Sequence, residues 1–262
     1  MTAFFEPLGD GRLRATPHTR GPWDPAYQHA GPPAALLGRA FERCEPRDDM
    51  VLARLTFEIL APIPVAEVEV ETRLIRPGRS VELLEGEVRA GGRSVVTARA
   101  WRMLAAAAPT AGGDERPPPR PSDPTPPPPG LDDFGYGHAV DMRFAAGAWE
   151  QPGPATVWTR LGVGLLAGEE PTGLQRLLAV ADSGNGISGV LRIDEWLYIN
   201  PELTVHLRRI PRGEWICLAA ETTISHGGAG LARSVLSDED GVVAHGAQSL
   251  LVAPRGGAPT RA

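Results

Sequence analysis

Residues Thr172–Asp182 read TGLQRLLAVAD, and this stretch decides how the rest of the chain is interpreted. Its apolar residues recur at helical spacing, and Thr172 is a residue type that caps the start of a helix. The apolar run ends on one acid, Asp182, with glycines at positions 184 and 186 close behind. The sequence predicts an amphipathic helix that ends on a carboxylate. Such an acid most simply solvates the helix end in a turn.

Four stretches with strand-like patterns follow this helix. They alternate apolar and polar residues and are rich in β-branched side chains. A single helix beside several long antiparallel strands buries its apolar stripe only if the sheet curls around it. The four stretches are LTVHLRRI (203–210), WICLAAETTIS (215–225), AGLARSVLSDED (229–240) and VVAHGAQSLLVA (242–253).

The first half of the chain repeats this order. GPPAALLGRAFERC (Gly31–Cys44) has helical spacing, and its two prolines suit a first turn, where amide donors have no partner. Ile63-Pro64 and Ile210-Pro211 are 147 residues apart, and Gly92 and Gly241 are 149 apart, which predicts an internal duplication. The strand-like stretches of this half are LARLTFEIL (52–60), VEVETRLI (68–75), SVELLEGEVRA (80–90) and RSVVTARAWRM (93–103).

A proline-rich segment separates the halves. Ten prolines fall between Pro109 and Pro129, and proline neither donates to a sheet nor continues a helix. We expect an exposed, partly extended linker, and the alternative is a PxxP ligand for a partner. The predicted organisation is a unit at 1–104, a linker at 105–130, a second unit at 131–255 and a flexible tail at 256–262. The fold class is α+β, with two tandem hotdog units, each a helix wrapped by a curved antiparallel sheet.

Composition excludes several classes of function. The chain has 262 residues and a formal net charge of −6, and all 26 of its Lys and Arg residues are arginine. A Schiff-base or P-loop lysine is therefore impossible, and nothing suggests a nucleic-acid partner. Cys44 and Cys217 lack metal-ligand spacing, so we expect neither a structural metal nor a disulfide scaffold. Without a signal peptide or a run of 18 apolar residues, a cytoplasmic protein with no membrane span is expected.

In this order, the segments resemble the type II acyl-CoA thioesterases, a double-hotdog family. The resemblance is carried by WDP at Trp23–Pro25, by QHAGPPAALLGRAFE in the first half, and by the aspartate that ends the second helix. It continues through the ETT and AQ pairs near the C-terminus. It implies a hydrolase of lipid metabolism that cleaves an acyl-CoA to the free acid and CoA, without a cofactor.

The resemblance also implies a catalytic set: an aspartate, a hydroxyl and a glutamine that hold one water. These fall on Asp182, Thr223 and Gln248, with Thr222 as the neighbouring hydroxyl and a substrate contact. A carboxylate takes the proton of the attacking water, and polar neighbours orient that water. The structural alternatives are a strand threonine and an outward strand glutamine.

Three further residues are predicted to bind substrate. His29 leads into the first helix and is placed to hydrogen-bond the thioester carbonyl, where helix amides also face an oxygen. Gly31 lets a substrate approach the backbone closely. Arg76, in the sequence RPGR, suits a coenzyme A phosphate. The alternatives are a packing histidine and a solvated loop charge.

Two other functions remain open at this point. Asp24 and His29 are five residues apart, as are the base and acid of hotdog enoyl-CoA hydratases, although the adjoining Asn-Pro is missing. A duplicated hotdog that binds acyl-CoA without turnover is the other alternative. Acyl chain length, the choice between coenzyme A and an acyl-carrier protein, and pairing into homo-oligomers are not readable from the sequence.

Overall fold

The computed structural model describes residues 2–107, 115–128 and 130–255, so the tail predicted at 256–262 lies outside the described residues. The first half opens with a hairpin, followed by a short 3₁₀ turn, one helix and four strands. These elements are β1 (Ala3–Gly9), β2 (Arg12–Ala15), η1 (Pro17–Thr19), α1 (Gly31–Arg43), β3 (Met50–Ile59), β4 (Glu67–Arg76), β5 (Val81–Ala90) and β6 (Arg93–Leu104).

The second half opens with a short helix and a hairpin, and it carries its long strands after its main helix. Short elements that the sequence did not reveal are inserted before and after that helix. The elements are α2 (Gly135–Ala139), β7 (Val140–Ala148), β8 (Gln151–Leu161), β9 (Gly164–Leu166), α3 (Gly173–Ala181), α4 (Gly184–Ile187), β10 (Trp196–Ile199), β11 (Glu202–Leu207), β12 (Trp215–Ile224), β13 (Ala229–Asp238) and β14 (Gly241–Pro254).

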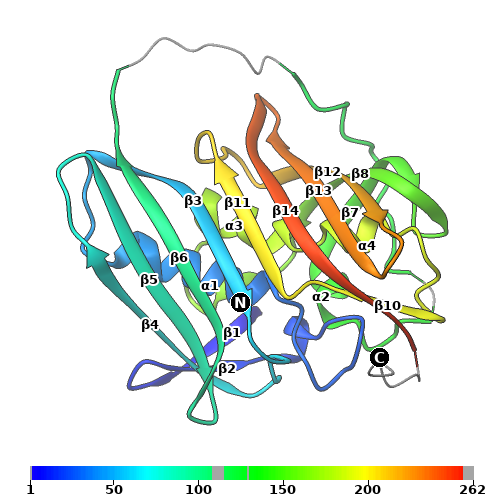
Figure 1. Ribbon diagram of the computed structural model, residues 1–262, viewed down its shortest axis with the longest axis horizontal. Helices are drawn as coiled ribbons and strands as arrows, with labels where there is room; N and C mark the ends of the chain where they lie inside the picture. The colour runs from blue at the N-terminus through cyan, green and yellow to red at the C-terminus, as the bar shows by residue number, and fades with distance from the viewer. Residues whose placement is uncertain (1, 108–114, 129, 256–262) are drawn as a thin grey trace.

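All the strands join in one sheet. Its order is β7-β8-β12-β13-β14-β11-β3-β6-β5-β4-β2-β1-β9, and β10 pairs on β14 (Figure 1). The strands β11 and β3 form the central pair of the sheet. Outward from β11 the strands are β14, β13, β12, β8 and β7, and outward from β3 they are β6, β5, β4, β2 and β1. Within each half, these strands follow one another along the chain in the same relative order. Each strand of the first half thus has a counterpart at the matching place on the other side of the sheet.

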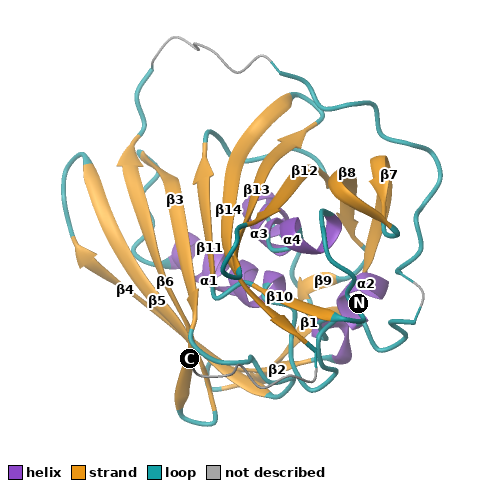
Figure 2. Ribbon diagram, turned by 45° about the vertical axis from the view of Figure 1, so that its right-hand side comes forward, coloured by secondary structure: helices purple, strands orange, loops and turns teal. Residues whose placement is uncertain are grey.

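The two main helices lie side by side against one face of this sheet (Figures 1 and 2). In α1 the apolar residues Leu37 and Phe41 are at most 1% exposed, and in α3 Leu174, Leu177 and Leu178 are fully buried. These side chains belong to one hydrophobic core, which takes residues from both halves. The helical stripes read from the sequence are thus buried against both the sheet and each other.

Each helix begins beside the end of the other. Thr172 caps α3 as predicted, because its Oγ1 accepts a hydrogen bond from the Gln175 amide at 3.3 Å. Glu42, near the end of α1, in turn accepts bonds from Thr172 Oγ1 at 2.8 Å and from Gln175 Nε2 at 2.7 Å. At the other crossing, the start of α1 lies beside the end of α3, where Asp182 is located.

Part of the proline-rich segment is anchored on the second half. Residues 115–128 have no regular secondary structure and are mostly exposed, in agreement with an extended linker. Two tryptophans nevertheless bind carbonyl groups of this segment: Trp158 Nε1 donates to Pro118 O at 3.0 Å, and Trp149 Nε1 donates to Pro126 O at 2.9 Å. This docking was not predicted.

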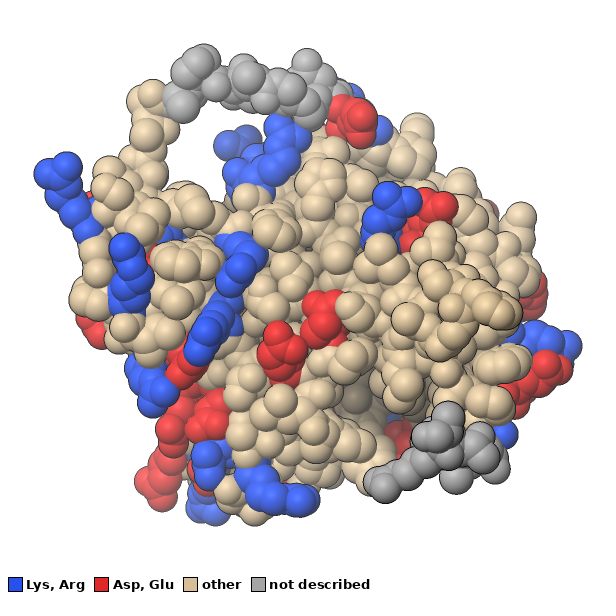
Figure 3. Space-filling model, in the orientation of Figure 1, with Lys and Arg blue, Asp and Glu red and all other residues tan. Residues whose placement is uncertain are grey.

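Charged side chains are unevenly distributed. Figure 3 shows arginines gathered over the strands of the first half, where Arg73 and Arg99 both pair with Glu85. Within the described ranges, no helix is long and apolar enough to cross a membrane.

Candidate active site

Asp182 lies at the corner between α3 and α4, and it is 4% exposed. A carboxylate at a helix C-terminus faces the negative end of the helix dipole, which is unfavourable. Burial adds a desolvation cost, so such an acid persists only if other groups hold it. The simple alternative, an acid that solvates the helix end, is therefore wrong.

Donors from three separate segments meet the Asp182 carboxylate. Asn200 Nδ2 donates to Oδ1 at 2.8 Å, and Gln248 Nε2 donates to the same oxygen at 3.2 Å. The Ala30 amide donates from the start of α1, and His29 Nδ1 lies 3.4 Å from Oδ2. The structure thus brings together Asp182, Gln248 and His29, which were predicted, and Asn200, which was not.

Gln248 is fixed in orientation by its own partners. It is 2% exposed, its Nε2 also reaches the Asp182 carbonyl at 3.2 Å, and its Oε1 accepts from the Asn185 amide at 3.2 Å. Donating at one end and accepting at the other, the amide cannot flip without losing bonds. The alternative of an outward-facing strand glutamine is therefore wrong.

Burial sets the protonation behaviour of the acid and the imidazole. Desolvation raises the pKa of Asp182 above its ordinary value, opposed by His29, Asn200, the Ala30 amide and Gln248. Desolvation also lowers the pKa of His29, opposed by the charge of Asp182. A carboxylate with a raised pKa is a stronger base, and a histidine with a lowered pKa is neutral near pH 7.

His29 is held rigidly between the two halves of the chain. Its ring stacks on Tyr136 with centroids 3.9 Å apart and an interplanar angle of 2°. Its Nδ1 accepts from the Gly31 amide at 3.1 Å, and Tyr136 Oη donates to the carbonyl of Ala179 in α3 at 2.9 Å. His29 therefore presents one fixed edge to Asp182.

Asp24 and His29 do not form a hydratase-like pair. Asp24 is exposed, and its Oδ1 accepts from the Ala26 amide at 2.8 Å within its own turn. The acid that contacts His29 is Asp182. Asp24 does line the same cavity as His29, but its described hydrogen bond stays within its own turn.

The start of α1 does not offer the free amides that were predicted there. Pro32 and Pro33 have no N–H, the Gly31 amide is bonded to His29, and the Ala30 amide to Asp182. Gly31 is also explained differently: a Cβ at this position would lie 2.2 Å from the carbonyl oxygen of Ala179. Gly31 therefore permits close packing of α1 on α3, and it does not line the cavity.

The two threonines of β12 point to opposite faces of the sheet. Thr223 is exposed, and its register partners are Leu231 and then Ser249, so it does not meet Asp182. Thr222 is 5% exposed and pairs with Ala232, which pairs with Gln248. The predicted hydroxyl at Thr223 is corrected, because a shift of one residue along a strand exchanges the faces.

Thr222 itself lies two strands from Gln248 on the inner face. Its Oγ1 is 2.8 Å from Ser188 Oγ, and Ser188 bonds back to the Gly184 carbonyl at 2.8 Å. This chain of bonds fastens the end of α4 to β12. Thr222 contacts neither Asp182 nor the lining of the cavity, so its described partners are structural.

A cavity of about 570 Å³ opens beside the acid. His29, Asp182 and Asn200 line it, and most of the other lining residues are apolar. Phe134, Met142 and Ile187 are buried lining residues, whereas Tyr27, Leu60 and Leu251 are exposed. An apolar cavity with a few convergent polar groups is typical of a small-molecule site.

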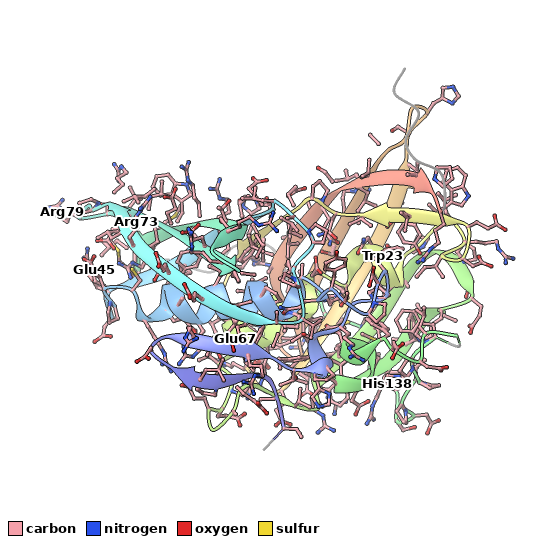
Figure 4. The ribbon with its side chains drawn as sticks, turned by 90° about the horizontal axis from the view of Figure 1, so that it is seen from below. Trp23, Glu45, Glu67, Arg73, Arg79 and His138 are labelled. Carbon is pink, nitrogen blue, oxygen red and sulfur yellow. The ribbon has the colours of Figure 1, made fainter. Side chains whose placement is uncertain are left out.

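Arg76 is not part of this cavity. Its guanidinium donates to the Val81 carbonyl at 2.9 Å and lies 5.8 Å from the centre of the Trp101 ring. Figure 4 shows Arg73 and Arg79, on either side of it in the sequence, at the opposite end of the molecule from Trp23, which lines the cavity. The structure thus does not bring Arg76 to the site.

Asn200 gave no usable signal in the sequence. It precedes Pro201 in the run INPEL, a pattern typical of a turn between strands. Its contact with Asp182 depends on the packing of β11 beside β14, which no local pattern reveals. Among the described residues, no group of three or more His, Cys, Asp or Glu side chains is placed to hold a metal ion.

Comparisons with solved structures show the fold. A protein from Thermobifida fusca, provisionally assigned as a thioesterase II, is 22% identical, with a TM-score of 0.73 over 97% of this chain and 98% of that one. A protein from Alicyclobacillus acidocaldarius with a hot dog fold is 18% identical, with a TM-score of 0.68 over 96% of each chain. An acyl-CoA thioesterase II from Mycobacterium marinum is 17% identical, with a TM-score of 0.66 over 97% of each. The fold is therefore a hotdog fold.

Sequence comparison with family models identifies both halves. A search of curated proteins finds no match to the chain. Residues 19–103 match the model of the acyl-CoA thioesterase N-terminal domain, and residues 114–252 match that of the C-terminal domain. Matched in this order over most of its length, the chain belongs to the acyl-CoA thioesterase family.

Proposed function

We propose that this protein hydrolyses an acyl-CoA to the free acid and CoA, with Asp182 as the general base. The observation that carries the proposal is a buried carboxylate, held by two amide side chains, that faces an apolar cavity. We also propose that the halves are two tandem hotdog units, with boundaries at 1–104 and 131–255. The matching strand order on the two sides of the β11–β3 pair supports this division.

In the proposed reaction, a water in the cavity attacks the thioester carbon while Asp182 takes its proton. The carbon–sulfur bond then breaks, the sulfur leaves as the CoA thiolate, and the proton passes from Asp182 to the thiolate or to solvent. A thiolate is a good leaving group, so no strong acid is required. The raised pKa of Asp182 supports this role, because a more basic carboxylate accepts the proton more readily.

Asn200 and Gln248 are the proposed positioning groups. Both donate to Oδ1 of Asp182, and Oδ2 lies on the side of His29, 3.4 Å from Nδ1. Neither amide titrates near neutral pH, so they orient the acid and transfer no proton. Asn200 takes the place that the sequence assigned to a hydroxyl on β12.

The proposal is tested by thiol release from a panel of acyl-CoAs. We expect Asp182→Asn to lower kcat about 10²–10⁴-fold, the usual contribution of a general base, with acyl-CoA binding kept. Asp10→Asn is the matched control, because Asp10 is exposed in the β1–β2 turn and is not among the residues that line the cavity. It should leave the rate unchanged.

Other outcomes separate the alternatives. Equal activity of the wild type and Asp182→Asn contradicts the role of the acid. Binding of acyl-CoA with no thiol release from any member of the panel indicates a binding protein. Addition of water to crotonyl-CoA without thiol release indicates a hydratase.

A further inference from the structure

The anchored part of the proline-rich segment, residues 115–128, runs along the free edge of the sheet and is here named the strap. The sheet order begins at β7, so one side of β7 has no strand partner. The Thr125 amide donates to the Met142 carbonyl at 2.6 Å, and the Phe144 amide donates to Thr125 Oγ1 at 3.3 Å. The strap therefore covers an edge that would otherwise be open for pairing.

Further contacts hold the strap along its length. The Arg143 guanidinium donates to the carbonyls of Pro121 and Ser122, at 3.2 and 2.6 Å. Arg120 stacks over the Trp215 ring, 4.5 Å from its centroid, and pairs with Glu239. With the two tryptophan donors, these bonds fix a segment whose prolines already restrict its backbone.

The strap reaches the cavity at one end only. Pro128, at the end of the strap, lines the cavity together with Leu131 and Trp149. Trp149 is thus both a wall residue and, through Nε1, the donor that holds Pro126. Trp158 holds the other end at Pro118 in the same way but does not line the cavity.

Trp149 and Leu131 are partly buried and pack against the hydrophobic core. Phe134 and Met142, which also line the cavity, are 7% and 3% exposed, whereas the lining residues Leu60 and Leu251 are 57% and 63% exposed. An apolar acyl group gains most by contacting the buried part of the lining, while the charged nucleotide of CoA stays in solvent. We therefore expect the acyl group to contact the wall to which Trp149 and Leu131 belong.

We propose that Trp149 and the strap set the acyl specificity of this cavity, an inference that rests on the proposed function. The hydrogen bond from Trp149 to Pro126 keeps Pro128 and Leu131 in place, and these residues limit the length or width of the acyl group. Loss of that bond frees the wall to move outward, and larger acyl groups are then accepted.

The test compares Trp149→Phe with Trp158→Phe. Each variant keeps an aromatic ring and loses one N–H donor to the strap, but only the first affects the cavity end. For each protein we would measure kcat/KM for thiol release over saturated acyl-CoAs of increasing length. We expect the ratio of long-chain to short-chain kcat/KM to rise about tenfold or more in Trp149→Phe, the order of discrimination that one methylene gives in an apolar pocket. Trp158→Phe should keep the wild-type ratio.

Leu131→Ala is a second test, in case the tryptophan variants do not fold correctly. It enlarges the same wall without removing a strap anchor, so it should shift the ratio in the same direction. If the wild type is active and all three variants keep its dependence of kcat/KM on chain length, this inference is overturned and the proposed function still stands. A wild type that releases no thiol overturns both.

Discussion

At the scale of single residues, the position of Asp182 in the fold determines its protonation behaviour. The side chain is ordinary, but α3 carries it to a corner where burial penalises its charge and raises its pKa. Asn200 and Gln248 partly compensate that penalty and fix the carboxylate at the same time. Removing one of these side-chain amides should therefore change both the pKa and the orientation of the Asp182 carboxylate.

Asn200→Ala should move the acidic limb of the kcat/KM profile to higher pH. The proposed base works only when ionised, so we expect activity to fall as pH drops through the pKa of Asp182. The Asn200 bond lowers that pKa, and its loss lets burial raise the pKa further. The measurement is thiol release against pH for the wild type and the variant.

Thr222→Ala is the control for this experiment, because Thr222 is buried on the same inner face but bonds to Ser188. Its profile should keep the position of the wild-type limb. A limb in Asn200→Ala that stays in place or moves to lower pH would mean that Asn200 does not stabilise the ionised acid.

The sequence predicted Asp182, Gln248 and His29 as site residues, and the structure brings all three together. Asp182 and Gln248 were assigned through the resemblance to the thioesterase family, because the residue pattern alone favoured a turn acid and a strand glutamine. The choice between Thr222 and Thr223 was not decidable, because it depends on which face of β12 is buried. Asn200 was missed because its role comes only from a tertiary contact.

At the scale of elements, the close packing of α1 on α3 depends on Gly31. Gly31→Ala should destabilise the protein by roughly 1–3 kcal/mol, since the added Cβ meets the backbone carbonyl of Ala179. The measurement is urea unfolding. Gly186→Ala is the matched control: its Cβ would meet nothing within 4 Å, so stability should stay the same or rise slightly.

A similar loss in both glycine variants would show that the helix contact is not the cause. Activity should also fall in Gly31→Ala, since the same backbone places His29 and Ala30 against Asp182.

The main elements were predictable and the inserted ones were not. Both long helices and the eight strands after them follow from periodicity, and their bounds differ from the prediction by only a few residues. The hairpins β1-β2 and β7-β8 and the short helices α2 and α4 were missed. These elements are short or contain glycine and proline, so their local sequence pattern is weak. Their structure depends on the neighbouring elements against which they pack.

At the scale of the whole molecule, the two halves share one sheet and one core. Leu55 and Phe57 of β3 face Val205 and Leu203 of β11 in the central pair, and all four are at most 2% exposed. Neither half can unfold without exposing that surface. We therefore expect a single calorimetric transition with equal van't Hoff and calorimetric enthalpies. Two separate transitions would show that the halves are independent.

The reciprocal contacts of the helix ends have a consequence for stoichiometry. Near-symmetry would give each chain two equivalent corners, but the acid near the end of α1, Glu42, accepts hydrogen bonds from two side chains at the start of α3. That carboxylate is occupied by Thr172 and Gln175, and only Asp182 faces the cavity. Titration of Asp182→Asn with an acyl-CoA should saturate at one equivalent per polypeptide. The first half thus acts as the partner that completes the corner of the second, through His29 and Ala30.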